Sequence, residues 1–344
     1  MKRIFALLLM LCLFPACAGA ETIERMISPD LTNAPWCEGI VFDMLMEEPK
    51  AFPSNVPMFE VGVAELDEAY LRGLLETYGM PKPEGERWHN GSDPLNGRSY
   101  VFSEINHGRY QLYSYPWGIR TQINEKENEA ALAMCRRFLT EADITQVEEP
   151  YYRVQRGNTP RSSTFDGAGT AIADLNLYPA EENEHYTGIG FRFLLGGLPV
   201  AVELLDETGQ QRTDKSLAPV YGSMTISDDG FITQFDLWNM PAVVKELEPY
   251  SGPLCTWETA VDAVLDRIIH HTYPGGEKHW LDGYQHVRIV AVEPNLALTP
   301  QGNTFPVWAV VYEYIEQLSS SQDGSRVYNS GVQYVDARTG EMIS

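Results

Sequence analysis

Residues 256–273, TWETAVDAVLDRIIHHTY, mark the start of the last folding unit, because their apolar side chains recur every three or four residues. The inward-facing set is Ala260, Val261, Val264, Leu265, Ile268 and Ile269. This spacing predicts an amphipathic helix that begins at Thr256 and ends near Tyr273, before Pro274-Gly275-Gly276. Three predicted strands follow it, at 286–292, 307–315 and 327–335.

The same order of elements occurs twice earlier in the chain. Apolar spacing predicts a helix over 65–78, with Gly79 as its C-terminal cap, and a second helix from Asn124 to about Asp143, where Asn124 and Glu127 form a capping box. Strand-like runs flank the turn signals that follow, at 99–104, 109–115, 151–154, 187–195, 199–205, 223–227 and 231–237. The proline-rich residues 21–57 are expected to be irregular, apart from one turn or strand at 40–46.

Three helices, each followed by antiparallel strands, predict an α+β fold: successive units of a helix packed on small antiparallel β-sheets. The 344 residues exceed the length at which one hydrophobic core usually divides, roughly 250 to 300 residues. We therefore expect three α+β units, at 21–120, 121–250 and 251–344, after a signal peptide at 1–20.

The first 20 residues have the order of a secretory signal peptide. Lys2 and Arg3 form a positive n-region, residues 4–14 an apolar run, and Ala18-Gly19-Ala20 a small-x-small cleavage site. The apolar run is shorter than the roughly 20 residues of a membrane-spanning helix. We expect cleavage after Ala20, no transmembrane span in the mature chain, and a location outside the cell or on the outer face of the cytoplasmic membrane.

A lipid anchor is the alternative for this segment. Phe14-Pro15-Ala16-Cys17 resembles the lipobox that precedes a lipidated cysteine in bacterial lipoproteins, with Phe and Pro in place of its usual Leu and Ala. Modification at Cys17 would anchor the mature chain to the outer face of the membrane. Cleavage after Ala20 and lipidation at Cys17 are both open at this point.

The charge balance excludes a nucleic-acid partner. The chain has 25 Lys and Arg against 48 Asp and Glu, and loss of residues 1–20 removes only Lys2 and Arg3, so the mature charge is 23 − 48 = −25. Nucleic-acid binding needs a basic stripe that neutralises phosphates, and the basic residues here are scattered. The acidity favours solubility and repulsion from anionic membrane surfaces.

The mature chain keeps three cysteines, Cys37, Cys135 and Cys255, which are widely spaced. Their odd number gives no disulfide framework, and one bridge plus a free thiol or three solitary thiols are both open. Cys135 lies on the apolar face of the helix predicted from Asn124. This position favours a core residue over one half of a catalytic Cys-His pair.

Four histidines lie near one another in sequence: His270, His271, His279 and His286. Adjacent helical residues point about 100° apart, whereas a metal ion bound on one helix favours histidines at i and i+4. The pattern therefore indicates histidines near the negative end of a helix dipole rather than a metal site.

No catalytic motif is present in the sequence, whether G-x-S-x-G, H-E-x-x-H, S-x-x-K or G-x-x-x-x-G-K-[ST]. Asp228-Asp229-Gly230 is typical of a hairpin turn rather than of a calcium loop. Tyr110, Tyr113, Tyr115 and Trp117 crowd one predicted hairpin, where core and rim positions are favoured over a sugar- or peptide-binding strip. The sequence thus assigns no catalytic, binding or metal residue and no cofactor.

Several short motifs in 190–344 occur in a characteristic order: Gly197-Leu198-Pro199-Val200, the Asp228-Asp229-Gly230 turn, Thr256-Trp257-Glu258-Thr259-Ala260, Phe305-Pro306-Val307-Trp308-Ala309, and 335–343, VDARTGEMI. This order resembles the extracytoplasmic regulators of Gram-positive bacteria, which include the YycH and YycI regulators of a two-component system, PepSY-type modules and uncharacterised secreted clostridial proteins. The resemblance implies a non-enzymatic role in which sheet edges and faces contact a sensor kinase, a peptidase or a wall component. YycH and YycI have an N-terminal transmembrane helix, whereas the leader here matches a cleavable signal.

We therefore expect a secreted or cell-envelope-associated binding or regulatory protein, with an envelope protein such as a sensor kinase or peptidase as its partner. The alternative is a secreted hydrolase that acts on a cell-wall glycan or peptide, with a site assembled from acids on distant strands.

Overall fold

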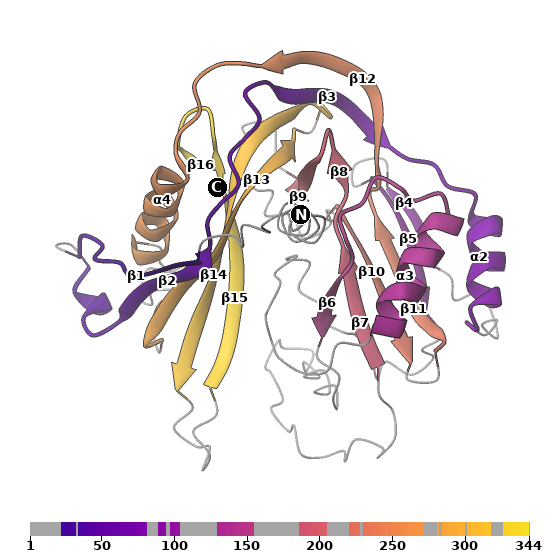
Figure 1. The fold of residues 1–344 in the computed structure, drawn as a ribbon, viewed down its shortest axis with the longest axis horizontal. Coiled ribbons are helices and arrows are strands. Elements are labelled where there is room, and N and C mark those ends of the chain that lie inside the picture. Colours follow the sequence, from indigo (N-terminus) through magenta and orange to yellow (C-terminus); the bar gives the residue numbers. More distant parts are fainter. Residues whose placement is uncertain are drawn as a thin grey trace, which may run out of the picture.

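The computed structural model describes residues 22–31, 34–80, 89–93, 97–103, 129–154, 186–204, 220–227, 230–270, 281, 284–299, 301–317 and 326–343. These residues form two lobes, each built on a β-sheet, which a two-stranded ribbon connects (Figure 1). The helices lie on the outer side of each lobe, so the two sheets face each other across the middle of the molecule.

The larger sheet belongs to the first lobe and has eight strands: β1 (Thr22–Met26), β2 (Val41–Glu47), β8 (Leu194–Leu195), β9 (Leu198–Leu204), β13 (His286–Leu298), β14 (Thr304–Gln317), β15 (Arg326–Asp336) and β16 (Met342–Ile343). Its main path runs β1-β2-β13-β14-β15-β16, while β9 also pairs with β13 and β8 with β9. β13 pairs in parallel with β2 near its start and with β9 near its end. This long strand therefore joins segments from the beginning, the middle and the end of the chain.

α4 (Trp257–His270) packs on one face of the larger sheet. Its apolar side chains share a buried cluster with Phe42 of β2, Ile289 of β13 and Val310 of β14. Thr256 caps the helix, since its hydroxyl accepts a hydrogen bond from the Thr259 amide at 3.3 Å. A short 3-10 helix, η1 (Pro35–Cys37), lies between β1 and β2.

The second lobe contains a six-stranded sheet in the order β4-β5-β11-β10-β7-β6, with every neighbouring pair antiparallel. Its strands are β4 (His89–Asp93), β5 (Gly97–Ser103), β6 (Tyr151–Val154), β7 (Tyr186–Phe191), β10 (Tyr221–Ser227) and β11 (Ile232–Trp238). α2 (Glu68–Thr77) and α3 (Glu129–Glu141) cover one face. Phe138 of α3 packs against Phe235 of β11, with ring centroids 4.9 Å apart.

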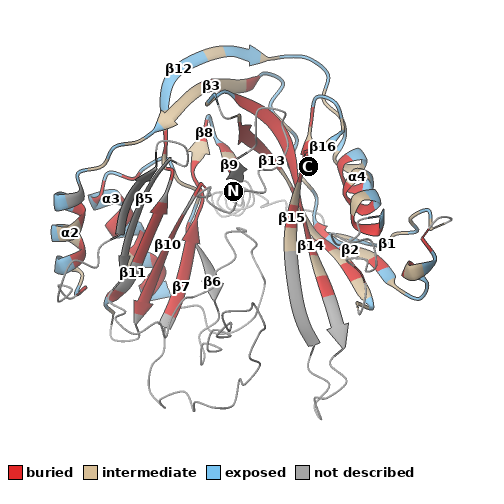
Figure 2. Ribbon diagram, turned by 180° about the vertical axis from the view of Figure 1, so that it is seen from behind, coloured by how far each residue is buried: buried red, intermediate tan, exposed pale blue. Residues whose placement is uncertain are grey.

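Two of the segments that cross between the lobes pair with each other. β3 (Val56–Val63) leads into the second lobe and β12 (Pro241–Tyr250) returns from it, and the two form an antiparallel ribbon. β12 is largely exposed along its length (Figure 2).

The ribbon is fixed at the turn between β13 and β14. The Phe59 amide donates to Thr304 Oγ1 at 2.7 Å, and the Val61 amide donates to the Gly302 carbonyl at 2.8 Å. Phe59 also belongs to the buried cluster that fills the second lobe, together with Leu296 near the end of β13. The buried cluster of the second lobe therefore extends into the larger sheet next to the ribbon.

The α+β class is confirmed, with strands more abundant than helices. The three predicted helices are present as α2, α3 and α4. α2 begins after the predicted start at 65 because the Asp67 side chain accepts the Tyr70 amide and caps it there. Gly79 has φ +84°, as expected of a C-terminal cap. The predicted strand 151–154 coincides with β6.

Residues 21–57 are more regular than the prolines suggested. They contain β1, β2 and the start of β3, of which only a turn or strand at 40–46 was expected. The sequence patterns also did not predict β4 or β12. These strands are short or exposed and depend on distant partners, so local composition is a weak guide to them.

Strand pairing does not follow the three consecutive units. β1 and β2, from the unit 21–120, join a sheet formed largely by 251–344, whereas β5 from the same unit pairs with β11 from 121–250. β9 from the central unit pairs with β13. Each sheet is thus assembled from segments far apart in the chain, and this property is not encoded in local patterns.

Candidate functional site

The face of the larger sheet that points away from α4 is the candidate site, and we call it the inner face because it looks toward the second lobe (Figure 1). Side chains alternate along β14, so that Val310 and Tyr312 pack toward α4 while Ala309 and Val311 lie on the inner face. The buried apolar residues of the inner face are Ala201, Ala297, Phe305, Val307, Ala309, Val311, Val332, Tyr334 and Ile343.

A row of charged residues crosses the inner face beside this apolar set. Asp43 of β2 stands opposite Arg288 of β13, and Arg288 stands opposite Glu313 of β14. Arg288 donates to Asp43 through Nε at 2.9 Å and through Nη2 at 2.8 Å. His286 lies two residues before Arg288, with its Nε2 2.9 Å from Asp43 Oδ1. Two basic side chains therefore hold the Asp43 carboxylate.

The pKa values of the two carboxyl groups in this row move in opposite directions. Burial alone raises the pKa of Asp43, but the hydrogen bonds from Arg288 and His286 outweigh burial and lower this pKa below its ordinary value. Burial raises the pKa of Glu313, and the positive charges of Arg288 and His286 oppose this only in part. Within the described part of the chain, no side chain forms a hydrogen bond or ion pair with the Glu313 carboxylate.

An ion network joins the two lobes near the other end of the inner face. Arg192, which follows β7, donates through Nε to Glu148 at 2.8 Å and through Nη1 to Glu293 of β13 at 2.7 Å. Only 9% of the Arg192 side chain is exposed. Asn295, two residues along β13 from Glu293, is 2% exposed, and its Oδ1 has no hydrogen-bond donor among the described residues.

The histidines that cluster in sequence are not brought together where the structure describes them. His270 is the last residue of α4, and its Nε2 lies 3.5 Å from Asp266 Oδ1 one turn earlier. His286 lies on the inner face, on the opposite side of the sheet from α4. His271 and His279 lie outside the described residues. No group of three metal-ligating side chains occurs among the residues that were described.

The three cysteines that the structure describes, Cys37, Cys135 and Cys255, are free thiols. Cys135 is fully buried in α3, as its place on the apolar face predicted, and burial raises its pKa to about 12. Burial also raises the pKa of Cys37 and of Cys255. Thiols with raised pKa values are poor nucleophiles at neutral pH, so none of the three is suited to catalysis.

Two of the sequence-based features fall partly or wholly outside the described residues. The aromatic hairpin, with Tyr110, Tyr113, Tyr115 and Trp117, lies outside them entirely. Of the Asp228-Asp229-Gly230 turn only Gly230 is described, and its φ of +81° fits the connection between β10 and β11.

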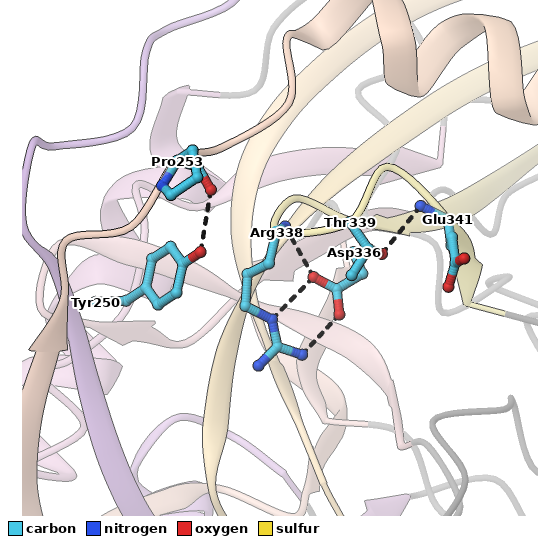
Figure 3. A network of polar contacts seen from close by, with 6 residues as sticks. All are labelled: Tyr250, Pro253, Asp336, Arg338, Thr339 and Glu341. Atoms are coloured by element: carbon cyan, nitrogen blue, oxygen red, sulfur yellow. Dashed lines mark hydrogen bonds and ion pairs between the residues drawn. The ribbon is translucent and has the colours of Figure 1, made fainter.

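The last of the resemblance motifs, 335–343, forms the turn between β15 and β16. Asp336 fixes this turn, because its Oδ1 accepts hydrogen bonds from the Arg338 amide at 2.8 Å and from Nε at 2.9 Å, while its Oδ2 accepts from Nη2 at 2.6 Å (Figure 3). Beside the turn, the Tyr250 hydroxyl donates to the Pro253 carbonyl at 3.0 Å. The motif residues are therefore explained by turn geometry.

Sequence reasoning did not single out Asp43, Arg288 or Glu313. The nearest signal is the alternation of charged and apolar residues at the start of β13, His286-Val287-Arg288-Ile289, which places both charges on one face. Nothing in the sequence places Asp43 beside them, because β2 and β13 are more than 200 residues apart along the chain.

Within the described residues, no helix is both long and apolar enough to cross a membrane.

No family model matches the chain, and no curated protein matches it. Among solved structures, it is similar to the crystal structure, at 1.45 Å resolution, of an uncharacterized protein from Eubacterium rectale ATCC 33656. The TM-score is 0.54 with 13% sequence identity, over 93% of this chain and 92% of that chain. At this identity the similarity shows the fold alone, which extends over nearly the whole of both proteins.

Proposed function

We propose that this chain is an exported, non-enzymatic binding or regulatory protein of the bacterial cell envelope. The observation that carries the proposal is the inner face, where a row of charged residues, Asp43, His286, Arg288 and Glu313, borders a buried apolar cluster. In this row Asp43 holds both Arg288 and His286, an arrangement that orders a recognition surface. Activation of a nucleophile would instead require a base that is oriented toward a hydroxyl or thiol.

The leader supports export. β1 starts at Thr22, so cleavage after Ala20 leaves one residue before the edge strand of the larger sheet. Lipidation at Cys17 would instead place the anchor five residue steps from Thr22, a reach of at most about 18 Å. The edge of an acidic protein would then be held against the membrane. The intact mass of the exported protein distinguishes the two alternatives.

The partner that we propose is an envelope protein, either a sensor kinase or a peptidase. The order of motifs in 190–344, which resembles that of extracytoplasmic regulators, supports this choice. The charge of the chain supports a protein partner over nucleic acid, because 48 acidic residues oppose 25 basic ones.

An affinity capture experiment tests the proposal. Immobilised residues 21–344 are exposed to detergent-solubilised envelope of the native host, washed with salt, and analysed by mass spectrometry. We expect reproducible capture of a sensor kinase or peptidase. Turnover of a wall peptide or glycan by the purified protein would contradict a non-enzymatic role.

The alternative function, a secreted hydrolase of cell-wall material, draws on one observation. Asp43 and Glu313 stand on strands two spacings apart, about 9.5 Å between backbones, with pKa values moved in opposite directions. Inverting glycosidases use an ionised and a protonated carboxyl group at a similar separation. The bidentate Arg288 contact weakens Asp43 as a base, so we rank this function second. It predicts that Asp43→Asn and Glu313→Gln each abolish release of reducing ends from purified peptidoglycan.

A further inference from the structure

We infer that β1 accepts an extended segment of a partner protein as a further strand of the larger sheet, with a lysine or arginine of that segment opposite Glu24 and an apolar residue opposite Met26. This inference rests on the proposed binding function and names the chemistry of the partner. It places the contact at the open edge of the sheet, beside Asp43, the first residue of the charged row.

The backbone of β1 has a free edge. β1 pairs with β2 on one side, and no other described strand pairs with it. The Ile27 amide donates to the Phe42 carbonyl at 2.9 Å, and hydrogen-bonded pairs alternate along an antiparallel ladder. The alternate set of residues, Thr22, Glu24 and Met26, therefore directs its N–H and C=O groups outward. Within the described residues, these outward groups have no hydrogen-bond partner.

The rest of the strand is fixed by α4. The Ile23 side chain packs against the buried cluster beneath this helix. The guanidinium carbon of Arg25 lies 5.4 Å from the ring centroid of Trp257, the first residue of the helix. β1 is thus held in an extended conformation before a partner arrives, which lowers the cost of adding a strand to it.

Exposed apolar side chains lie beside this edge. Met26 is 66% exposed, Leu45 41% and Val41 40%. Met26 stands opposite Asp43, while Leu45 and Val41 lie two residues to either side of Asp43, so the three lie within diagonal cross-strand reach. Figure 1 shows β1 at the side of the first lobe that is remote from the second lobe, so this patch is open to a partner.

Two exposed carboxylates set the charge that fits. Glu24 stands opposite Leu45 and Glu47 opposite Thr22, on the same face as Met26. A basic side chain opposite Glu24 would be attracted to it, whereas an acidic one would be repelled. The formal charge of −23 on the whole chain adds long-range attraction for a basic segment.

A second copy of this chain fits the edge poorly. Antiparallel pairing of two β1 strands over all five residues places Glu24 opposite Glu24 of the second copy. Like charges that stand directly opposite each other destabilise a strand pair. The occupant that fits is therefore a segment of a different protein.

The exposed strand β12 differs from β1 in the features that discourage strand addition. β12 contains Pro241, Lys245 and Pro249, and its pairing with β3 has two irregularities. Prolines, lysines and irregular pairing protect sheet edges from further strands. β1 has no proline and no lysine, and its pairing with β2 is regular throughout.

Binding of a labelled peptide, Ser-Leu-Thr-Arg-Val-Thr-Ser, to residues 21–344 tests the inference by fluorescence anisotropy. When the peptide lies antiparallel to β1 with its leucine opposite Met26, its arginine stands opposite Glu24 and its arginine amide faces β1. The valine amide faces away. One counterpart has glutamate in place of the arginine, and two others carry an N-methyl group on the arginine amide or on the valine amide.

We expect the arginine peptide to bind about fivefold more tightly than the glutamate peptide, because the charge opposite Glu24 is reversed. The methyl group on the arginine amide should weaken binding about tenfold, because it removes a hydrogen bond to β1, and the methyl group on the valine amide should have little effect. No binding of the arginine peptide, or equal effects of the two methyl groups, overturns the inference.

Variants of the protein test the register. Glu24→Lys should prefer the glutamate peptide, whereas Glu246→Lys, the same change on the exposed strand β12, should keep the preference of the wild type. Both variants should keep the thermal unfolding transition. A Glu24→Lys variant that still prefers the arginine peptide contradicts the inference. So does a dimer of the free wild type in sedimentation velocity that Glu24→Pro converts to a monomer, since the edge would then belong to a second copy.

Envelope capture with the same variants separates this inference from the proposed function. If Glu24→Lys captures the sensor kinase or peptidase to the same extent as the wild type does, the inference fails while the binding function stands. If the arginine peptide binds along β1 but no envelope protein is captured, the site stands and the regulatory role fails.

Discussion

Asp43 and Glu313 lie in one row on the same face of the sheet, yet their pKa values shift in opposite directions. Ion pairing determines the shift of Asp43, whereas burial determines the shift of Glu313. The folded pKa of Asp43 is lowered from 3.8, so this carboxylate adds stability above its unfolded pKa, and the contribution is lost as pH falls through the folded pKa. The folded pKa of Glu313 is raised from 4.5, so its ionisation at neutral pH costs stability, and this cost is absent below the unfolded pKa.

We therefore expect Glu313→Gln to be more stable than the wild type at pH 7 and to lose this advantage near pH 4. Asp43→Asn should be less stable than the wild type at pH 7, with the difference shrinking as the solution is acidified toward pH 2. Urea unfolding of residues 21–344 at several pH values measures both effects. A Glu313→Gln advantage that does not change with pH would contradict the assigned cause.

Arg192 is a second residue whose role depends on its surroundings. Its replacement by alanine leaves Glu148 and Glu293 facing each other without their shared cation. We expect a loss of about 3 kcal/mol in the free energy of unfolding, as for other ion pairs that are largely buried. Arg136, which is 43% exposed and pairs with Glu149 on the surface, is the control. Its alanine variant should lose less than about 1 kcal/mol, and equal losses would argue against a structural role for the Arg192 network.

Cys135 gives a chemical test of the α3 core. Because this thiol is fully buried and its pKa is about 12, it should not react with a thiol reagent at pH 8 in the folded protein. It should react fully in guanidinium chloride, and peptide mapping identifies the modified residue. Rapid labelling of Cys135 in the native state would show that α3 does not pack as described.

At the level of elements, the helices were predictable because the interactions that define them are local. Spacings of three and four residues located α2, α3 and α4, and turn residues such as Gly79 and Gly230 marked where elements end. The sheets were less predictable. β13 pairs with β2, β9 and β14, and two of these strands come from distant parts of the chain.

The candidate site was hidden from sequence analysis for the same reason. Arg288 and Glu313 belong to predicted neighbouring strands, but their relative position depends on a register that the loop between them does not specify. The irregular pairing between Ile289 and Ala291 shifts that register further. Only the tertiary structure shows that Arg288 lies between Asp43 and Glu313 and donates its hydrogen bonds to Asp43.

The end of α2 offers a test at the element scale. Gly79 has φ +84°, and a Cβ atom at this position would collide with the Phe231 ring. Gly39 has φ +87° with no atom within 4 Å of such a Cβ. Alanine at Gly39 should therefore cost about 1 kcal/mol, from backbone conformation alone. Alanine at Gly79 should cost about 2 to 4 kcal/mol, because overpacking adds to the same term. Chemical denaturation compares the two variants, and equal costs would mean that Phe231 does not pack against this turn.

On the scale of the whole molecule, the two sheets face each other, and the connections between the lobes differ in kind. The exposed ribbon of β3 and β12 carries two chain crossings, whereas the β8–β9 segment, which pairs with β13, and the contacts of Arg192 connect the lobes near the centre. This arrangement holds the inner face of the larger sheet opposite the second lobe. The binding surface that we propose there consists of residues that only the complete fold brings together.

Hydrogen exchange of residues 21–344, alone and bound to the envelope protein that they capture, tests most directly whether the inner face is the proposed binding surface. We expect the captured protein to slow exchange in β2, the first half of β13 and the second half of β14, and to leave α2, α3 and α4 unchanged. Slowed exchange confined to the helices or to the ribbon, or no change in the saturated complex, would contradict the assignment of the inner face.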